Sequence, residues 1–399
     1  MNTILNKRLL RNIKLDYIGT FLANLNMQSS IWVLYLSYCG LNLAQIGFLE
    51  GIYHATSIVC EIPSGAVADL LGRKRSMVLS RVCIAFSCII MLLTRNFWLF
   101  ALSFVIQAMG NNFNSGSEEA LVYDSMKYAG QENQYIGVCG KLNMIIEVSQ
   151  GIATVAGGIL AEYSYFWCYF FCFVISLLAL IPVLFLFEAP VDSDSKGKTQ
   201  RKSFWDMVCS HFEISFHILK KDMRILKLMA YYSVVFAFYT LLFFYSQQYF
   251  WDMGYSKIHI SVIMFFAGIS SCGGAAFSQW LSEKLGKGTG IVSASMIAIS
   301  LLCFGVEKAR ISVFVFILAG FFNSVLYPVK SEALNRLIPS GQRATLISVE
   351  SMAFSVAMIV LFPLAGTLAK GWGLSAVLAL CGVILFVFAG FWEIWQRKN

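Results

Sequence analysis

The chain has 399 residues, of which 58% are hydrophobic and only 13% are charged. Soluble domains carry about 25% charged residues, so this composition excludes an ordinary water-soluble fold and indicates a membrane protein. The net charge of +8 does not come from a basic patch with interleaved aromatic residues, so we predict no nucleic-acid partner. The eleven cysteines form no Cys-x-x-Cys pair, so we predict no metal, no cofactor and no disulfide framework.

Long apolar segments follow one another along the whole chain. A membrane-spanning helix needs about 20 residues. Nine stretches without Asp, Glu, Lys or Arg meet that length: 17–49, 96–117, 163–187, 228–251, 258–282, 288–306, 311–329, 351–369 and 371–392. Three further apolar segments, near 43–70, 75–94 and 135–162, are interrupted by a few charges. We therefore predict an all-α membrane protein with twelve transmembrane helices, nine clear and three interrupted.

The positive charges orient this arrangement. With the N-terminus inside, the outer segments hold only five of the 30 lysines and arginines, which leaves 25 inside. The five are Arg95, Lys257, Lys308, Arg310 and Lys370. Cytoplasmic segments of membrane proteins carry such an excess. We predict a multi-pass protein of the plasma membrane, embedded in its lipid bilayer, with both termini cytoplasmic.

The chain divides near its midpoint. Residues 188–224 are the only long polar stretch, and we predict a six-helix bundle over 1–187 and another over 225–399. The stretch is either an interfacial helix or a flexible tether. Two internal echoes indicate a parallel duplication: "DLLGRKRSMVLS" recurs as "EKLGKGTGIVSA" at an offset of 214 residues, and "SEEAL" recurs as "SEAL". Repeated six-helix halves are a transporter design.

A loop motif makes the family resemblance specific. The stretch "SGAVADLLGRKRS" resembles the motif between the second and third helices of the major facilitator superfamily, Gly-x-x-x-Asp-x-x-Gly-Arg-Lys/Arg. It matches at Gly65, Asp69, Gly72, Arg73 and Lys74. The resemblance implies two six-helix bundles related by pseudo-two-fold symmetry. The arginine and proline of the superfamily's drug antiporters are absent from "VIQAMGNN" and "QGIATVAGGIL".

The motif suggests a conformational switch. Gly65 and Gly72 allow a tight turn and close helix approach. The carboxylate of Asp69 can meet helix N-terminal amides or Arg73. By resemblance, the loop latches the two halves in the outward-facing state. The alternative is a simple positive-inside anchor, although an anchor requires neither the glycines nor the aspartate.

Acidic residues within apolar segments are candidates for proton coupling, because a charge there is costly. Glu147 lies on a polar stripe with Asn143, and we expect it to be buried and to carry a proton. Glu50, His54 and Glu61 share one helix face. The alternatives are a carboxyl group held by a neighbouring helix and a histidine that is merely hydrogen-bonded.

Amide and tyrosine side chains are the candidates for the substrate cavity. By resemblance, helices one, four, seven and ten line a central cavity. Such mixed surfaces suit an amphipathic organic solute. Helix-to-helix hydrogen bonding is the alternative for each residue. The candidates are Asn24, Gln28, Gln107, Asn111, Asn143, Tyr231, Tyr239, Asn323 and Tyr327.

Charges at inner helix ends are candidates for an inner gate that bridges the two halves, namely Glu119, Asp124, Lys330 and Glu332. Solvated helix ends are the alternative. The chain has no phosphate-binding loop and no hydrolase motif, which argues against an ATPase or an enzyme. We therefore predict a monomeric secondary carrier of a small molecule, with proton-coupled efflux. A symporter or uniporter for uptake is one alternative, and a receptor or membrane enzyme on a transporter-like scaffold is another.

Overall fold

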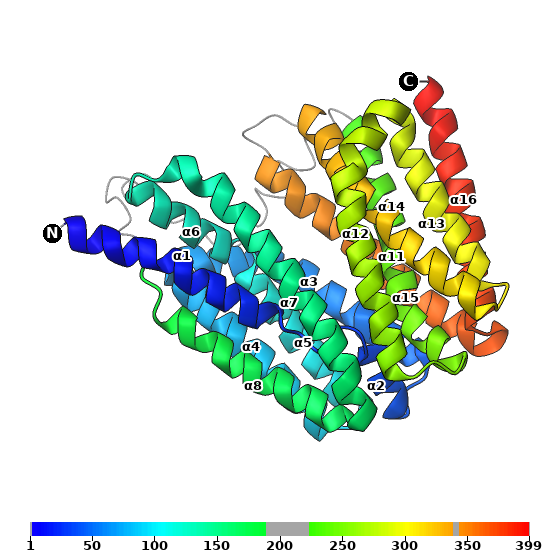
Figure 1. The fold of residues 1–399 in the computed structure, drawn as a ribbon, viewed down its shortest axis with the longest axis horizontal. Helices are drawn as coiled ribbons and strands as arrows, with labels where there is room; N and C mark the ends of the chain where they lie inside the picture. The colour runs from blue at the N-terminus through cyan, green and yellow to red at the C-terminus, as the bar shows by residue number, and fades with distance from the viewer. Residues whose placement is uncertain (1, 189–222, 338–342, 399) are drawn as a thin grey trace. The chain divides into compact units, whose positions relative to one another are not determined.

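The computed structural model describes residues 2–188, 223–337 and 343–398, and within these ranges it contains helices and no strands. The helices before the central gap are α1 (Asn2–Asn24), α2 (Trp32–Tyr38), α3 (Leu43–Leu71), α4 (Arg73–Leu93), α5 (Phe97–Asn114), α6 (Ser117–Tyr128), η1 (Glu132–Gln134), α7 (Tyr135–Tyr163) and α8 (Tyr165–Leu184). Those after it are α11 (Met223–Asp252), α12 (Lys257–Leu285), η2 (Gly286–Gly288), α13 (Thr289–Phe304), α14 (Ala309–Leu337), α15 (Arg343–Trp372) and α16 (Leu374–Lys398) (Figure 1).

Eight of the described helices are long and apolar enough to cross a membrane. They are Arg73–Leu93, Glu132–Tyr163, Tyr165–Leu184, Met223–Asp252, Lys257–Leu285, Ala309–Leu334, Ser348–Trp372 and Leu374–Ile394. A helix pairs its own backbone N–H and C=O groups in hydrogen bonds, which is required in the hydrocarbon interior of a membrane. The all-α membrane fold is therefore confirmed, whereas the count of twelve and the pseudo-two-fold symmetry stay predictions. The predicted interfacial helix or tether falls mostly on residues 189–222, outside the described residues.

The chain forms two compact units, which differ from the predicted halves. The first unit contains residues 1–29 and 56–212, and the second contains 30–55 and 213–399. Residues 30–55 belong to the second unit because they pack against its helices. The backbone N–H of Val33, for example, donates to Oε1 of Gln247 on α11 at 3.2 Å.

Glycines bring helices of the second unit into backbone contact. A Cβ atom on Gly274 of α12 would lie 2.0 Å from the carbonyl oxygen of Phe321 on α14. Only a residue without a side chain permits this approach, as in other membrane helix pairs. Gly268, on the same α12, has no such neighbour within 4 Å of a Cβ.

The first half of α3 packs against α15 in the same way. A Cβ on Gly47 would lie 2.6 Å from the carbonyl oxygen of Phe362, and one on Gly366 would lie 2.2 Å from that of Leu43. The hydroxyl group of Tyr245 donates to both carbonyls, at 3.0 Å for Phe362 and 3.3 Å for Leu43. This tyrosine thus fastens the contact between α3 and α15.

The apolar stretch that begins at residue 17 does not form one continuous helix. α1 ends at Asn24 and α2 begins at Trp32, with turns between them. The intervening sequence "LNMQSSI" is rich in side chains that compete for backbone hydrogen bonds, which explains the interruption. Within the first unit, α7 approaches this break closely, since a Cβ on Gly157 would lie 1.9 Å from the carbonyl oxygen of Met27.

Candidate functional site: charge clusters of the two units

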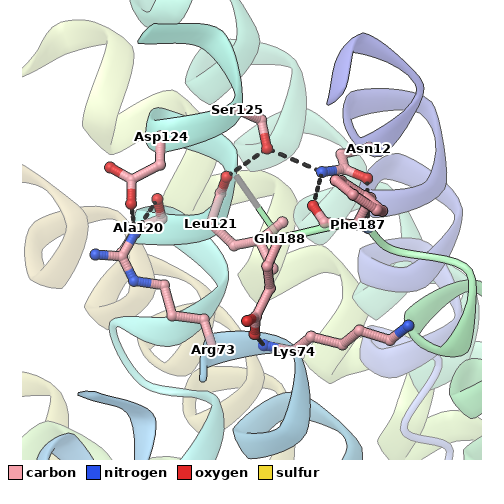
Figure 2. A network of polar contacts seen from close by, with 9 residues as sticks. All are labelled: Asn12, Arg73, Lys74, Ala120, Leu121, Asp124, Ser125, Phe187 and Glu188. Carbon is pink, nitrogen blue, oxygen red and sulfur yellow. Dashed lines mark hydrogen bonds and ion pairs between the residues drawn. The ribbon is translucent and has the colours of Figure 1, made fainter. Parts of the chain in front are cut away.

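The loop motif lies at the junction of α3 and α4 in the first unit (Figure 2). Gly72 has φ +97°, a backbone conformation that favours glycine, and α4 begins directly after it. Arg73 of α4 forms an ion pair with Asp124 of α6 and donates to the carbonyl oxygen of Ala120 at 2.6 Å. Its guanidinium group therefore joins the start of α4 to α6.

Glu188 occupies the N-terminus of α4. Its Oε1 accepts a hydrogen bond from the backbone N–H of Lys74 at 2.6 Å (Figure 2). A Cβ on Gly72 would lie 2.6 Å from each carboxylate oxygen, so the glycine leaves room for this group. Free backbone N–H groups and the helix dipole both favour an anion at this position.

Asn12 connects this cluster to α1. Its Nδ2 donates to Oγ of Ser125 on α6 at 2.9 Å and to the carbonyl oxygen of Phe187 at 2.6 Å (Figure 2). The N–H of Phe187 returns a hydrogen bond to Oδ1 of Asn12 at 3.0 Å. The amide thus fixes the segment after α8, and with it the position of Glu188.

These contacts alter the predicted roles of the motif. The partner of Arg73 is Asp124, and the carboxylate at the helix N-terminus is that of Glu188. The side chain of Asp69 lies outside the described residues. The close helix approach expected at Gly65 is not observed, because no neighbour lies within 4 Å of a Cβ there.

A second cluster is buried deeper in the first unit. Arg81 of α4 pairs with Glu118 of α6 at 3.8 Å, and the side chains are 6% and 17% exposed. Asp16 of α1, a residue only 3% exposed, is within electrostatic reach of both. By sequence, Asp16 lies on a polar stripe of the first helix, Glu118 lies at an inner helix end, and Arg81 interrupts the apolar segment near 75–94, but their meeting was not predicted.

The second unit buries an acid and a base together. Nε2 of His54 lies 3.5 Å from Oε1 of Glu50 one turn away, and Nδ1 shares a hydrogen bond of 3.2 Å with Oγ of Ser355 on α15. Both residues are 8% exposed. Glu61, on the same face by sequence, belongs to the first unit, and Glu147 is exposed on α7 rather than buried as expected.

The family follows from comparison with known proteins. Residues 17–309 match the sequence model of the Major Facilitator Superfamily. The chain belongs to this superfamily. An uncharacterised MFS-type transporter of Bacillus subtilis strain 168, YxaM, is 23% identical over 372 residues, which cover 90% of this chain and 89% of the relative. The predicted resemblance is thus confirmed.

Solved transporters share the MFS fold. The nucleoside transporter NupG has a TM-score of 0.73 at 13% identity and covers 99% of both chains. The peptide transporter POT, crystallised with sulfate, has a TM-score of 0.71 at 12% sequence identity, and the match covers 97% of this chain and 94% of the transporter. A D-xylose-proton symporter has a TM-score of 0.69 at 13% sequence identity, and the match covers 97% of both chains. These similarities show the shared fold, and the superfamily match identifies a transporter of the MFS type.

The cavity candidates fall into different environments. In the first unit, Asn24 accepts a hydrogen bond from Gln150 at 3.2 Å. Asn111 and Asn143 are exposed, Gln107 is half-buried and Gln28 is 9% exposed. In the second unit, Tyr327 is 65% exposed, while Tyr239 and Asn323 are half-buried.

Tyr231 does not fit the prediction that it lines a cavity. It is 1% exposed, donates to the carbonyl oxygen of Gly290 at 3.2 Å and stacks on Trp392 with 4.4 Å between ring centroids. Its ring therefore belongs to the interior of the second unit.

Two of the four inner-gate candidates, Lys330 and Asp124, form ion pairs within single units. Lys330 of α14 pairs with Glu350 of α15, and its Nζ lies 4.7 Å from the ring centroid of Tyr327. Asp124 binds Arg73 inside the first unit, while Glu119 and Glu332 are exposed. Bridges from one half to the other stay a prediction. No group of three or more His, Cys, Asp or Glu that could hold a metal occurs among the described residues.

Proposed function

We propose that this MFS protein is a secondary active transporter that exports a small, amphipathic organic solute in exchange for protons, by alternating access. The observation that carries the proposal is the charged cluster on the family's loop motif. Arg73, Asp124 and Glu188 use charge-assisted contacts, which form and break in discrete geometries. The loop acts as a latch between conformational states.

The proposal includes the wider architecture. Twelve transmembrane helices form two six-helix halves in the cell membrane, both termini are cytoplasmic, and the monomer is the functional form. Support comes from the apolar stretches and from the excess of lysine and arginine on the inner side. Amides and tyrosines contact the solute, and Asn24 and Tyr327 are among the candidates.

Proton coupling is supported by the acidic groups within the helices. Glu50, His54, Glu61 and Glu147 are the candidates, and the Glu50–His54 pair is the most enclosed of those described. The driving force is adequate, since one charge that crosses 100 mV of membrane potential provides about 2.3 kcal/mol. Uptake symport or uniport is the second candidate, and a symporter with the same fold makes it worth testing.

Flux into proteoliposomes tests the proposal. The purified protein is reconstituted, and uridine, a dipeptide, D-xylose and the amphipathic cation ethidium are tested with and without an imposed pH gradient. We expect flux of at least one compound, driven by the gradient. Flux that does not depend on the pH gradient refutes proton coupling and favours a uniporter. No flux across the panel favours a receptor.

The coupling residues are tested in the same assay. Glu147→Gln and His54→Gln are compared with Glu162→Gln, an exposed carboxyl group on α7. Loss of gradient-driven flux with retained exchange identifies a coupling residue. Unchanged gradient-driven flux removes that residue from the mechanism.

A further inference from the structure

Three charged side chains of the first unit lie in its interior and leave one negative charge uncompensated. Asp16 is 3% exposed, Arg81 is 5% exposed, and the side chain of Glu118 is 17% exposed. They come from α1, α4 and α6. Two carboxylates and one guanidinium group carry a net charge of about −1 when all are ionised, and an uncompensated interior charge is costly. One bound proton makes the cluster neutral.

Glu118 has the partners that an ionised carboxylate needs. Thr20 donates to its Oε1 at 2.6 Å, and Asn114 donates to its Oε2 at 2.5 Å. Arg81 lies 3.8 Å from the same Oε2. Both oxygens are therefore satisfied by donors, one of them also by a positive charge, so Glu118 is the carboxylate that Arg81 neutralises.

Asp16 lacks such partners. Its buried Oδ2 has no hydrogen-bond partner in the described part of the chain, and neither has the buried Nε of Arg81. An ionised carboxylate accepts hydrogen bonds at both oxygens, and leaving one unmet in the interior costs about 1–3 kcal/mol or more. The proton that neutralises the cluster therefore belongs on Asp16.

The surroundings of Asp16 support this assignment. Arg81 on α4 and Glu118 on α6 act electrostatically on Asp16, and the neighbouring Tyr17 on α1 is a further titratable group that interacts with it. α7 and α8 also pack against α1, but neither contributes a charge there. The guanidinium group repels a metal cation, whereas a proton needs only one oxygen atom. The site is thus suited to a proton rather than to sodium.

We propose that Asp16 is a proton-binding group of the transport cycle, and that the Glu118–Arg81 pair sets the charge balance against which it gains and loses its proton. In one state the carboxyl group is neutral. In the other state it releases the proton and becomes a carboxylate, after a rearrangement has brought water or a hydrogen-bond donor to Oδ2. This inference rests on the proposed proton coupling.

The first experiment measures the proton directly. Purified full-length protein in lipid nanodiscs is titrated with pH while infrared difference spectra record the C=O stretch of protonated carboxyl groups. We expect a titrating band in wild type and in Glu162→Gln that is missing from Asp16→Asn. A band retained in Asp16→Asn overturns the inference, as does a band that sodium chloride, but not choline chloride, removes.

Folding is controlled with a conservative variant. Asp16→Glu keeps the carboxyl group, so it should retain the band at a shifted frequency even if Asp16→Asn fails to fold. If a folded Asp16→Glu gives the wild-type band unchanged, the signal comes from another residue and the assignment is wrong.

The second experiment separates this inference from the proposed function. In proteoliposomes, Asp16→Asn should lose pH-gradient-driven flux of whichever tested compound is transported, and should keep exchange at equal pH. A purely structural role would reduce both. Gradient-driven flux that survives in Asp16→Asn overturns the role of Asp16 but leaves proton coupling intact. Wild-type flux that does not depend on the pH gradient overturns proton coupling itself.

Discussion

The contact between α12 and α14 predicts a large difference between two identical substitutions on one helix. In Gly274→Ala, the new Cβ would lie 2.0 Å from the carbonyl oxygen of Phe321. Non-bonded heavy atoms prefer about 3.5 Å, so the helices must separate by about 1.5 Å or distort. Overpacking of this kind costs about 1–3 kcal/mol.

Gly268→Ala is the matched control. It lies on the same α12, and its Cβ would have no such neighbour within 4 Å. Each substitution gains up to about 1 kcal/mol of helix propensity, so this gain cancels when the two variants are compared. The difference in the free energy of unfolding therefore isolates the packing cost, and we expect it to be about 1–3 kcal/mol.

Thermal unfolding in nanodiscs, followed by tryptophan fluorescence, measures this difference. We expect the midpoint of Gly268→Ala to equal or exceed that of wild type, and the midpoint of Gly274→Ala to lie below it. Equal midpoints for the two alanine variants would show that α12 and α14 do not approach at this glycine.

Three further predictions use the same unfolding assay. Glu188→Gln removes the anion at the N-terminus of α4 and should cost about 0.3–1 kcal/mol at low salt, a difference that disappears in high salt; a salt-independent loss would contradict the role of charge. Tyr245→Phe removes the hydroxyl donor to two carbonyls and should cost about 1 kcal/mol, and an unchanged midpoint would show that these hydrogen bonds contribute nothing. Lys330→Met and Glu350→Leu should each destabilise the protein by up to about 3 kcal/mol, and the double variant by less than their sum; additive losses would show that the pair is not coupled.

The membrane fold was predictable because every backbone group in a bilayer must find a partner within the chain, which forces long apolar helices. The turn at Gly72 was predictable, because glycine favours the positive φ that the backbone adopts there. The break after Asn24 was not predictable, because the amides of that segment would also fit a polar stripe on a continuous helix. The spacing of polar residues predicts which face of a helix they share, but not where their side chains interrupt the backbone hydrogen bonds.

The candidate site was predictable only in part. Asp124 was identified as a functional charge, but its partner is Arg73 of the same unit rather than a group in the other half. Glu188 follows α8 and is 114 residues from Lys74, so no local spacing indicates their contact. The burial of Asp16 with Arg81 likewise depends on the packing of three helices far apart in sequence.

The bond between Glu188 and the backbone of Lys74 has a mechanical consequence. Glu188 lies four residues after the end of α8, so this bond ties the end of α8 to the start of α4. Releasing it, as in Glu188→Gln, should therefore let the end of α8 move independently of the motif loop.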